Sequence, residues 1–308
     1  MPQQNIAAEP SGILILHKPV GITSHDAVYK IRKLYGTKRV GHTGTLDPLA
    51  EGVLVMLVGR AAKAAEYLVC DSKEYVATLR LGLTTDTEDI TGEVLTRHDG
   101  ALPACEQVVD AVSRFLGETE QIPPMYSALK VGGKKLCDLA REGKTVKRVA
   151  RRITIHSISA VPTDSDGDYA LTVACSSGTY IRTLCADIGK ELGCGGVMAT
   201  LLRTSAGGFS IDSAVTLEEL EEKTVDERLR LLLPVEQLFS LLPAVCLPEF
   251  YRKLCKSGCE IYQRKIHTSY GVGDRVRICD EKGKFFALGE VMDYPDGTAI
   301  KSIKLFEI

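Results

Sequence analysis

Hydrophobic and polar residues are spaced along the first sixty positions in a way that predicts a strand, a helix and a second strand. Residues 13–16 form an apolar run that stops at Pro19, which is typical of a short strand. Ser24 is a plausible N-cap, and Gly36 closes the helix that follows. Four apolar residues recur between them at helical spacing: Ala27, Ile31, Leu34 and Tyr35. Residues 53–58 then predict a buried strand.

Similar patterns continue along the rest of the chain. Alternating or β-rich segments predict strands at 73–83, 153–158 and 169–175, and further short elements at 197–202 and 209–211. Apolar residues at helical spacing predict helices at 60–68, 106–116, 180–192 and within the acid-rich segment 216–242. Beyond Pro243, three strands at 274–279, 285–292 and 298–308, joined by turn sequences, predict a small β-rich module. Residues 1–11 lack such a pattern and predict a flexible tail.

Composition indicates a soluble globular protein and leaves nucleic-acid binding open. The chain has 308 residues, 44% hydrophobic and 25% charged, which suits about two domains. Its net charge of −2 alone argues against a nucleic-acid partner, because phosphates favour a basic surface. Residues 130–152, however, hold nine Lys or Arg against two acids. Such a local patch can bind RNA on a chain whose total charge is near zero.

The cysteines and the apolar runs predict a cytoplasmic protein without a membrane span. The ten cysteines are scattered without a CxxC pair, and residues 1–12 do not resemble a signal peptide, so we expect free thiols. The longest strongly apolar run, 53–58, is far too short to cross a bilayer. Four residues of the C-terminal part raise the question of zinc: Cys255, Cys259, His267 and Cys279. Their spacing is loose, so we predict no metal site.

The most informative segment is the loop 41–52, GHTGTLDPLAEG. Three glycines and a proline indicate a shaped loop, and the segment lacks the spacing and the lysine of a phosphate-binding P-loop. Within it, Asp47 stands between Leu46 and Pro48. The ordinary interpretation of such an Asp-Pro is a side chain that caps the following turn. The alternative is a carboxylate held rigid for chemistry.

Six segments of the chain, in order and in spacing, resemble the TruB family of tRNA pseudouridine synthases. They are HKPVGITSHDAV (17–28), GHTGTLDPLAEGVL (41–54), DSKEY (71–75), QIPPMYSALKVGGKKL (121–136), CSSGTYIRTL (175–184) and MATLLRTSAGGF (198–209). The resemblance covers about residues 12–212. The tail after Pro243 resembles, more weakly, a PUA-type RNA-binding module.

The resemblance implies a fold and a reaction. The fold is α+β: a pseudouridine-synthase domain at 12–243, with a central, largely antiparallel mixed sheet flanked by helices, and a PUA-like module at 244–308. The reaction isomerises the T-loop uridine of tRNA at position 55, by cleaving the C–N glycosidic bond, turning the uracil and forming a C–C bond. It needs no cofactor and no metal, and the enzyme acts alone as a monomer.

The same resemblance assigns the chemistry to Asp47 as the one essential carboxylate. It can attack the base or the sugar, or act as a base that stabilises a cationic sugar. Arg182 matches the arginine that pairs with this aspartate; a guanidinium favours the ionised carboxylate and orients it. Without the resemblance, Arg182 would be interpreted as a surface arginine on a helix. Tyr75 matches the tyrosine that stacks on the flipped uracil, and stacking of about 1–3 kcal/mol offsets much of the cost of flipping.

Four further positions match the family's supporting residues. Tyr180 and Leu202 match residues that line the uracil pocket, although both suit an ordinary core. His42 matches a histidine that supports the displaced nucleotides. Lys18, next to Pro19, matches a lysine that braces the active-site loop.

The basic segment 124–152 matches the family's insertion that clamps the T-arm of tRNA. The alternative is a solvated, mobile loop, and a segment that orders only on RNA satisfies both interpretations. Its candidate contacts to the RNA backbone are Lys130, Lys134, Lys135, Arg148, Arg151 and Arg152.

Three other functions stay open. A guide-RNA-dependent relative usually lacks the long basic insertion. A non-catalytic tRNA-binding or tRNA-folding protein would not need Asp47, Tyr75 and Arg182 together. A glycosidase generally needs two carboxylates across one site, and the sequence offers one convincing candidate.

Overall fold

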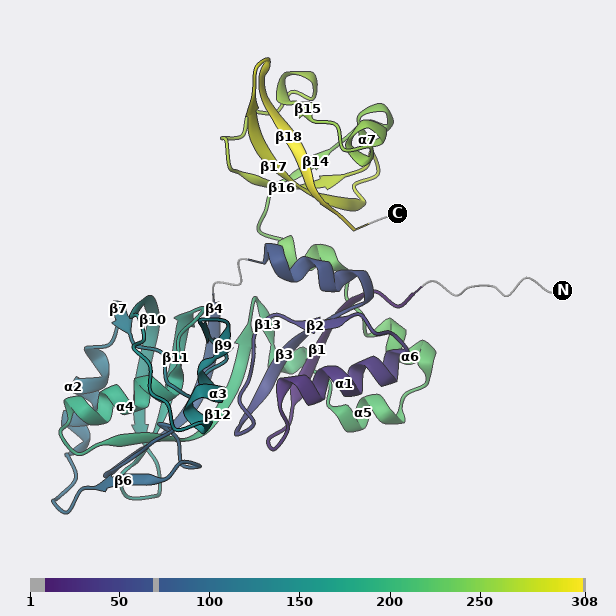
Figure 1. Ribbon diagram of the computed structural model, residues 1–308. Helices are drawn as coiled ribbons and strands as arrows, with labels where there is room; N and C mark the ends of the chain where they lie inside the picture. Colours follow the sequence, from purple (N-terminus) through teal and green to yellow (C-terminus); the bar gives the residue numbers. More distant parts are fainter. Residues whose placement is uncertain (1–8, 69–71, 307–308) are drawn as a thin grey trace.

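A computed structural model describes residues 9–68 and 72–306 (Figure 1). Most of the predicted tail, residues 1–8, therefore lies outside the described residues. The main sheet has the order β1-β3-β12-β4-β11-β10-β7, with β2 and β13 added to β3 and β12. Only β12 and β3 run parallel among its pairs in the described residues. The sheet is mixed and largely antiparallel, as predicted.

The strands of the main sheet lie between residues 12 and 210. They are β1 (Gly12–Lys18), β2 (Val40–His42), β3 (Ala50–Val58), β4 (Ser72–Leu81), β7 (Gly117–Gln121), β10 (Arg151–Pro162), β11 (Asp168–Ser176), β12 (Gly196–Ala206) and β13 (Phe209–Ser210). A separate hairpin is formed by β5 (Leu83–Thr85) and β6 (Val94–Arg97).

Helices cover the sheet in two groups (Figure 1). One half carries α2 (Cys105–Ser113) and α4 (Ile181–Glu191), and the other carries α1 (Ser24–Tyr35), α5 (Leu217–Glu222) and α6 (Val225–Arg230). The short 3-10 helices are η1 (Gly59–Tyr67), η2 (Ile211–Ser213), η3 (Val235–Phe239) and η4 (Gln263–Lys265). The segment predicted as a helix at 60–68 thus takes the tighter 3-10 form. None of the helices in the described ranges is long and apolar enough to cross a membrane.

Strand β1 is buried on both faces, which explains its unbroken apolar run. Leu14 and Leu16 pack into the core that includes α1 and α4, while Ile13 and Ile15 pack into a second core on the other side of the sheet. Burial on both sides replaces the alternation expected of a half-exposed strand.

Helix α1 begins one residue earlier than the sequence suggested. Thr23, rather than Ser24, is the N-cap: its hydroxyl accepts from the Asp26 N–H, and the Asp26 carboxylate accepts from the Thr23 N–H. This reciprocal pair is a capping box. The end of the helix is as predicted, because Gly36 adopts the left-handed conformation with φ of 63°.

The basic segment 124–152 has short regular structure. It contains β8 (Lys130–Val131), β9 (Lys134–Lys135) and α3 (Leu136–Arg141), and Leu136 is 1% exposed. The Leu136 N–H donates to the Leu129 carbonyl at 2.7 Å. The segment therefore contains a two-stranded hairpin and a short helix anchored by the buried Leu136.

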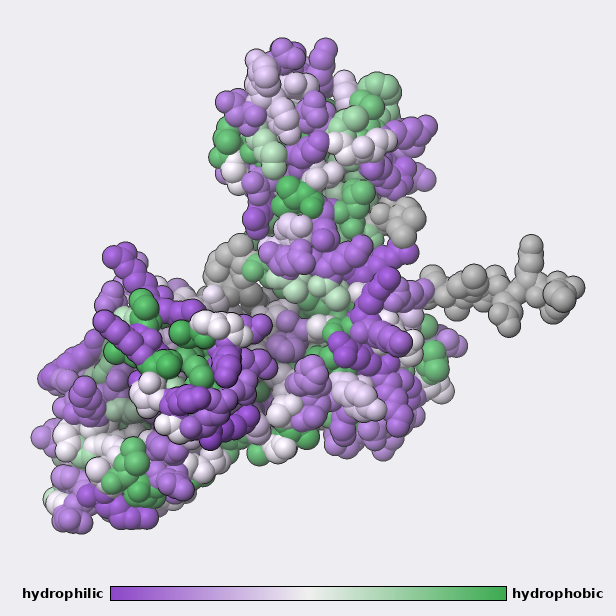
Figure 2. Space-filling model, viewed as in Figure 1, coloured by the Kyte–Doolittle hydropathy of each residue, from purple (hydrophilic) through white to green (hydrophobic). Residues whose placement is uncertain are grey.

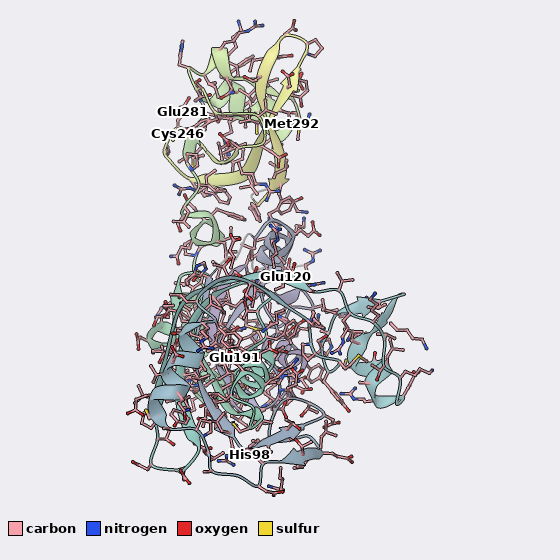
Figure 3. The ribbon with its side chains drawn as sticks, turned by 90° about the vertical axis from the view of Figure 1, so that its left-hand side faces the viewer. His98, Glu120, Glu191, Cys246, Glu281 and Met292 are labelled. Atoms are coloured by element: carbon pink, nitrogen blue, oxygen red, sulfur yellow. The ribbon has the colours of Figure 1, made fainter. Side chains whose placement is uncertain are left out.

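Residues 244–305 contain a second sheet with the order β14-β16-β17-β18-β15. Its elements are β14 (Ala244–Cys246), α7 (Glu249–Lys256), β15 (Ile261–Tyr262), β16 (Arg275–Cys279), β17 (Phe285–Tyr294) and β18 (Gly297–Leu305). Strands β16 to β18 confirm the three predicted strands. Figure 3 shows this module, with Cys246 and Met292 labelled, above the main sheet.

Contacts with η1 and η3 fix the module to the rest of the protein. Ala64, Phe239 and Phe285 share one buried cluster. The Tyr67 hydroxyl donates to the Ile303 carbonyl at 3.2 Å. The predicted boundary at residues 243–244 therefore falls between two sheets that share a packed interface.

Candidate active site

The segment that carries Asp47 is tied to the start of helix α1. The Ser24 hydroxyl donates to the Leu46 carbonyl at 2.9 Å and accepts from the Leu46 N–H at 2.8 Å. The Gly21 N–H donates to the Pro48 carbonyl at 2.8 Å. The backbone on both sides of Asp47 is therefore fixed, so the carboxylate projects from a rigid turn.

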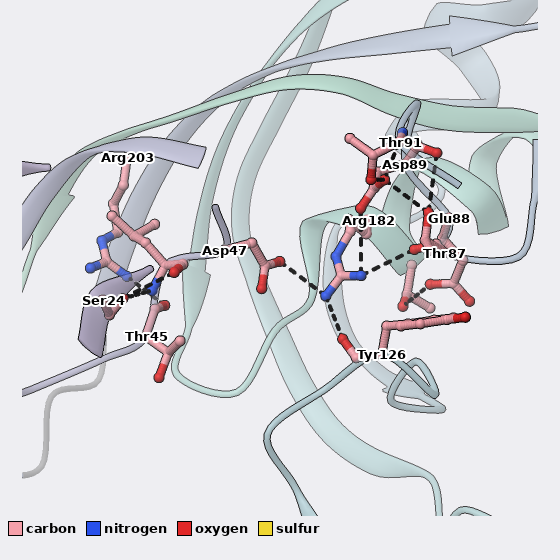
Figure 4. Close-up of polar contacts among 12 residues, drawn as sticks. Ser24, Thr45, Asp47, Thr87, Glu88, Asp89, Thr91, Tyr126, Arg182 and Arg203 are labelled. Atoms are coloured by element: carbon pink, nitrogen blue, oxygen red, sulfur yellow. Dashed lines mark hydrogen bonds and ion pairs between the residues drawn. The ribbon is translucent and has the colours of Figure 1, made fainter. Parts of the chain in front are cut away.

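A buried arginine, Arg203 on β12, holds the same loop from the other side (Figure 4). Its side chain is 1% exposed and donates to the carbonyls of Val53 at 2.7 Å, Gly44 at 3.0 Å and Thr45 at 3.4 Å. Gly52 is required here, because a Cβ at this position would lie 2.2 Å from the Arg203 carbonyl oxygen. Sequence reasoning missed Arg203; the available signal was a basic residue inside a strand with an apolar pattern.

Lys18 supports the loop indirectly. It is 0% exposed, and its Nζ donates to the carbonyls of Pro19 at 2.7 Å and Ile22 at 2.9 Å. Burial lowers the pKa of Lys18 to about 8, against the opposing effect of the Asp47 charge. Lys18 therefore fixes the turn 19–22, which in turn contacts Pro48.

Asp47 and Arg182 lie in direct contact (Figure 4). Nη2 of Arg182 is 3.0 Å from Oδ2 of Asp47, and their side chains are 6% and 39% exposed. The same guanidinium donates to the carbonyls of Tyr126 at 2.7 Å and Thr87 at 3.1 Å. Arg182 is a buried, multiply bonded residue and not the surface arginine that a lone helical position suggested. The aspartate keeps an accessible side toward solvent.

A second carboxylate, Asp89, holds Arg182 from within the protein. Its Oδ2 is 3.6 Å from Nη1 of Arg182, and its side chain is 7% exposed. Its Oδ1 accepts from the Thr91 N–H at 2.9 Å and the Thr87 hydroxyl at 2.8 Å. Sequence reasoning missed Asp89, which stands in a polar segment without a distinctive motif. Because Asp89 is buried and bonded to Arg182, it cannot serve as the second exposed carboxylate of a glycosidase.

Tyr75 lies beside this cluster. On β4 it is 7% exposed and pairs across the sheet with Arg203 of β12. Burial raises the pKa of the Tyr75 phenol, and the Asp47 charge adds to the effect. Leu202, the neighbour of Arg203, is half-buried and pairs with Val76. Tyr75 is thus a neutral aromatic ring close to Asp47.

Tyr180 is positioned by a buried glutamine, Gln121. The Gln121 amide donates to the Tyr180 carbonyl at 3.0 Å and accepts from the Tyr180 N–H at 2.8 Å, and its residue is 3% exposed. Gln121 ends β7 and directly precedes the basic segment. It fixes the start of helix α4, two residues before Arg182.

His42 lies at the end of β2 with a buried Nδ1 that has no hydrogen-bond partner among the described residues. Burial lowers its pKa, and the positive charge of Arg203 adds to this. The imidazole is therefore neutral near pH 7.

The six basic candidates of segment 124–152 differ in their exposure to solvent. Arg148 is half-buried and donates to the Pro123 carbonyl at 3.0 Å, so it holds the segment itself. The other five are exposed: Lys130, Lys134, Lys135, Arg151 and Arg152. Within the described part of the chain, no group of three or more His, Cys, Asp or Glu side chains is placed to hold a metal ion.

Comparison with solved structures shows where this fold recurs. A chain in the crystal structure of a Cbf5-Nop10-Gar1 complex is 27% identical, with a TM-score of 0.74 over 96% of this chain and 85% of that chain. A chain in the structure of an H/ACA RNP bound to a substrate RNA containing 2'-deoxyuridine is 25% identical, with a TM-score of 0.73 over the same shares.

Comparisons with sequence families and with individual relatives agree with the structural comparison. The N-terminal domain of TruB family pseudouridylate synthase matches residues 32–181, and the tRNA pseudouridylate synthase B C-terminal domain matches residues 182–240. The tRNA pseudouridine synthase B of Bacillus licheniformis is 45% identical over 284 residues, and that of Bacillus subtilis is 43% identical over 291 residues. Each alignment covers 90% of this chain and 92% of the relative.

The fold and the matched families define a pseudouridine synthase, an isomerase that acts on uridine in RNA. Within that class, the chain belongs to the TruB family.

Proposed function

We propose that this enzyme converts the T-loop uridine at position 55 of tRNA to pseudouridine, with Asp47 as its catalytic carboxylate. One observation carries the proposal: an aspartate on a rigid turn, 3.0 Å from a buried arginine, keeps an accessible carboxylate. The relatives named tRNA pseudouridine synthase B support tRNA as the substrate.

The reaction requires the uracil to leave the T-loop stack and reach Asp47. Flipping costs a few kcal/mol, which stacking on the neutral Tyr75 ring offsets in part. Asp47 then attacks the base or the sugar, or acts as a base that stabilises a cationic sugar. All three routes need the carboxylate fixed, and Arg182, 3.0 Å away, holds its orientation. The uracil C–N bond breaks, the base turns, and a bond forms to C5, whose hydrogen is lost.

Other residues position the reacting groups. Tyr180, fixed through Gln121, and Leu202 line the uracil pocket in this proposal. His42 supports the displaced nucleotides in this proposal, and Lys18 braces the turn beside Pro48.

In this proposal, different parts of the chain have different roles. We assign catalysis to residues 12–243, with 124–152 as the clamp on the T-arm, and RNA binding to the PUA-like module 244–308. The enzyme works in the cytoplasm as a monomer without an obligate protein partner. The alternatives are a guide-RNA-dependent enzyme and a tRNA-binding or tRNA-folding protein without activity.

Mapping of the product tests the proposal. Unmodified tRNA transcript is incubated with the purified chain alone, and pseudouridine is located by carbodiimide modification and primer extension. We expect one modified site at position 55, and none on a transcript with cytidine there. Modification at another position would contradict the substrate assignment. Tight binding without product would favour the guide-dependent or the non-catalytic alternative.

A further inference from the structure

We propose that a basic hollow at the C-terminal end of helix α1 is a second contact surface for the RNA backbone of the substrate. It is separate from the segment 124–152 and from the C-terminal module. The inference rests on the proposed function, because it takes RNA as the substrate.

The hollow has a volume of about 320 Å³. Its lining residues come from the last turns of α1 and the segment that follows: Tyr29, Arg32, Lys33, Gly36, Thr37 and Lys38. Tyr29, Arg32, Lys33 and Gly36 are spaced by three or four residues, so they lie along one side of the helix. Figure 2 shows the surface over α1 and its neighbour α5 as largely hydrophilic.

The cations of the hollow have unused capacity to bind an anion. Lys33 and Lys38 are exposed and make no hydrogen bond or ion pair within residues 9–68 and 72–306. Arg32 is half-buried: its Nη2 donates to the Val40 carbonyl at 3.3 Å and its Nε is buried. Arg32 therefore adds positive charge to the hollow, while the two exposed lysines are the groups that can reach an anion.

In the described part of the chain, none of these three cations forms an ion pair with an acid. Asp26, the one acid within residues 24–39, is committed to the Thr23 cap. Glu9 binds the Thr37 hydroxyl at 2.8 Å and Arg39 at 3.0 Å. The residues that line the hollow thus include three cations and no acid, on a chain whose total charge is −2.

Tyr29 adds an aromatic surface beside the cations. Its side chain is 68% exposed, and no aromatic partner packs on it in the described part of the chain. Lysines bind phosphates, and an exposed ring stacks on a base or a ribose. Together they fit an RNA strand better than an acidic peptide, which would leave the ring without a partner.

The hollow is held in a fixed position relative to Asp47. Helix α1 starts at Ser24, which bonds Leu46 directly before Asp47, and its 12 residues extend about 18 Å. Figure 1 shows α1 on one side of the main sheet's central strands and the segment with α3 and β9 on the other. The hollow and the segment 124–152 are therefore two separate basic surfaces of the chain.

Salt dependence of binding tests this surface. Dissociation constants for a fluorescent tRNA transcript are measured between 50 and 300 mM salt for wild type, Lys33→Gln, Lys38→Gln and Tyr29→Ala. Each lysine variant should lower the salt slope by about 0.7–0.9, the value for one lost phosphate contact. Tyr29→Ala should weaken binding several-fold at every salt concentration and leave the slope unchanged, because stacking releases no counterions.

Lys30→Gln is the matched control, because Lys30 is exposed on the same helix, about 100° around from Tyr29, and does not line the hollow. Wild-type slopes for Lys33→Gln and Lys38→Gln would overturn the inference. An equal decrease for Lys30→Gln would also overturn it, since that indicates only general charge attraction. Product formation by wild type on the same transcript separates the two proposals. If wild type modifies the RNA and the lysine variants bind normally, the hollow alone is refuted.

Discussion

Nη1 of Arg182 lies 3.6 Å from Oδ2 of Asp89, while Nη2 of the same guanidinium faces Asp47 at 3.0 Å. Arg182 is thus held between a buried carboxylate and the proposed catalytic one. Two backbone carbonyls complete its hydrogen bonding. A guanidinium fixed at this many points has little freedom to rotate away from Asp47, which suits a group that must stay oriented through the reaction.

Asp89→Asn should therefore slow catalysis more than it weakens RNA binding. The amide removes the charge that holds Arg182, and a small displacement of Asp47 should lower kcat by about 10- to 100-fold, or about 1.4–2.8 kcal/mol. Asp168→Asn is the control: Asp168 is similarly buried and pairs with Arg80 at 2.7 Å, away from the site. Single-turnover rates should fall for Asp89→Asn alone. Equal rates in both variants would remove Asp89 from the account.

Ser24→Ala tests the tie between α1 and the catalytic turn. The change leaves the buried N–H and carbonyl of Leu46 without their partner, which costs about 1–3 kcal/mol of unfolding free energy. Thr23→Ala, which removes the cap, costs about 0.5–2 kcal/mol and does not touch the turn. Both should lower the Tm, but only Ser24→Ala should also lower kcat. Loss of kcat in Thr23→Ala at a matched loss of stability would contradict this assignment.

Sequence patterns predicted the elements of the sheet because burial on one or both faces leaves a period that can be recognised. Strand β1, helix α1 with its Gly36 end, and strands β16 to β18 are examples. Ser24 shows the limit of such patterns, since both Thr23 and Ser24 suit an N-cap. Ser24 instead bonds the backbone of Leu46, 22 positions away in the sequence, and a local pattern cannot predict that partner.

The residues of the candidate site also differ in whether the sequence predicts them. Asp47 and Arg182 stand in recognisable motifs, so they could be named before their contact was known. Gln121 and Arg203 act through hydrogen bonds, and Asp89 through an ion pair, to residues far away in sequence. No local pattern predicts such a partner. The hairpin in segment 124–152 was missed because its buried leucines, Leu136 and Leu139, stand in polar sequence.

Lys18 gives the protein a defined response to pH. Its pKa is lowered from 10.5 to about 8, so below pH 8 it is protonated in both the folded and the unfolded chain. Between about pH 8 and 10.5 the unfolded chain retains a proton that the folded chain has lost, so this group makes the folded state more stable as pH rises. The difference in unfolding free energy between wild type and Lys18→Met should grow in favour of wild type by at most about 1.4 kcal/mol per pH unit. Denaturant titrations at pH 7 to 9.5 measure it, and a constant difference would contradict the lowered pKa.

The exposed cations of segment 124–152 should act through phosphates. Lys134→Gln with Lys135→Gln should lower the salt slope of tRNA binding by about 1.4–1.8, two contacts' worth. Arg148→Gln should behave differently, because Arg148 holds the Pro123 carbonyl: it should lower the protection of this segment from proteolysis more than the lysine changes do. An unchanged slope in the lysine variant would mean that this face does not touch RNA.

The most direct test of the central claim is tritium release from tRNA transcribed with uridine tritiated at C5, using wild type and Asp47→Asn. Isomerisation replaces the hydrogen on C5, so release reports the reaction itself, and the asparagine keeps the shape of the aspartate without its charge. We expect about one equivalent released per tRNA by wild type and none by Asp47→Asn, with tRNA binding nearly equal in the two. Release by Asp47→Asn at the wild-type rate would contradict the assignment of Asp47 as the catalytic carboxylate.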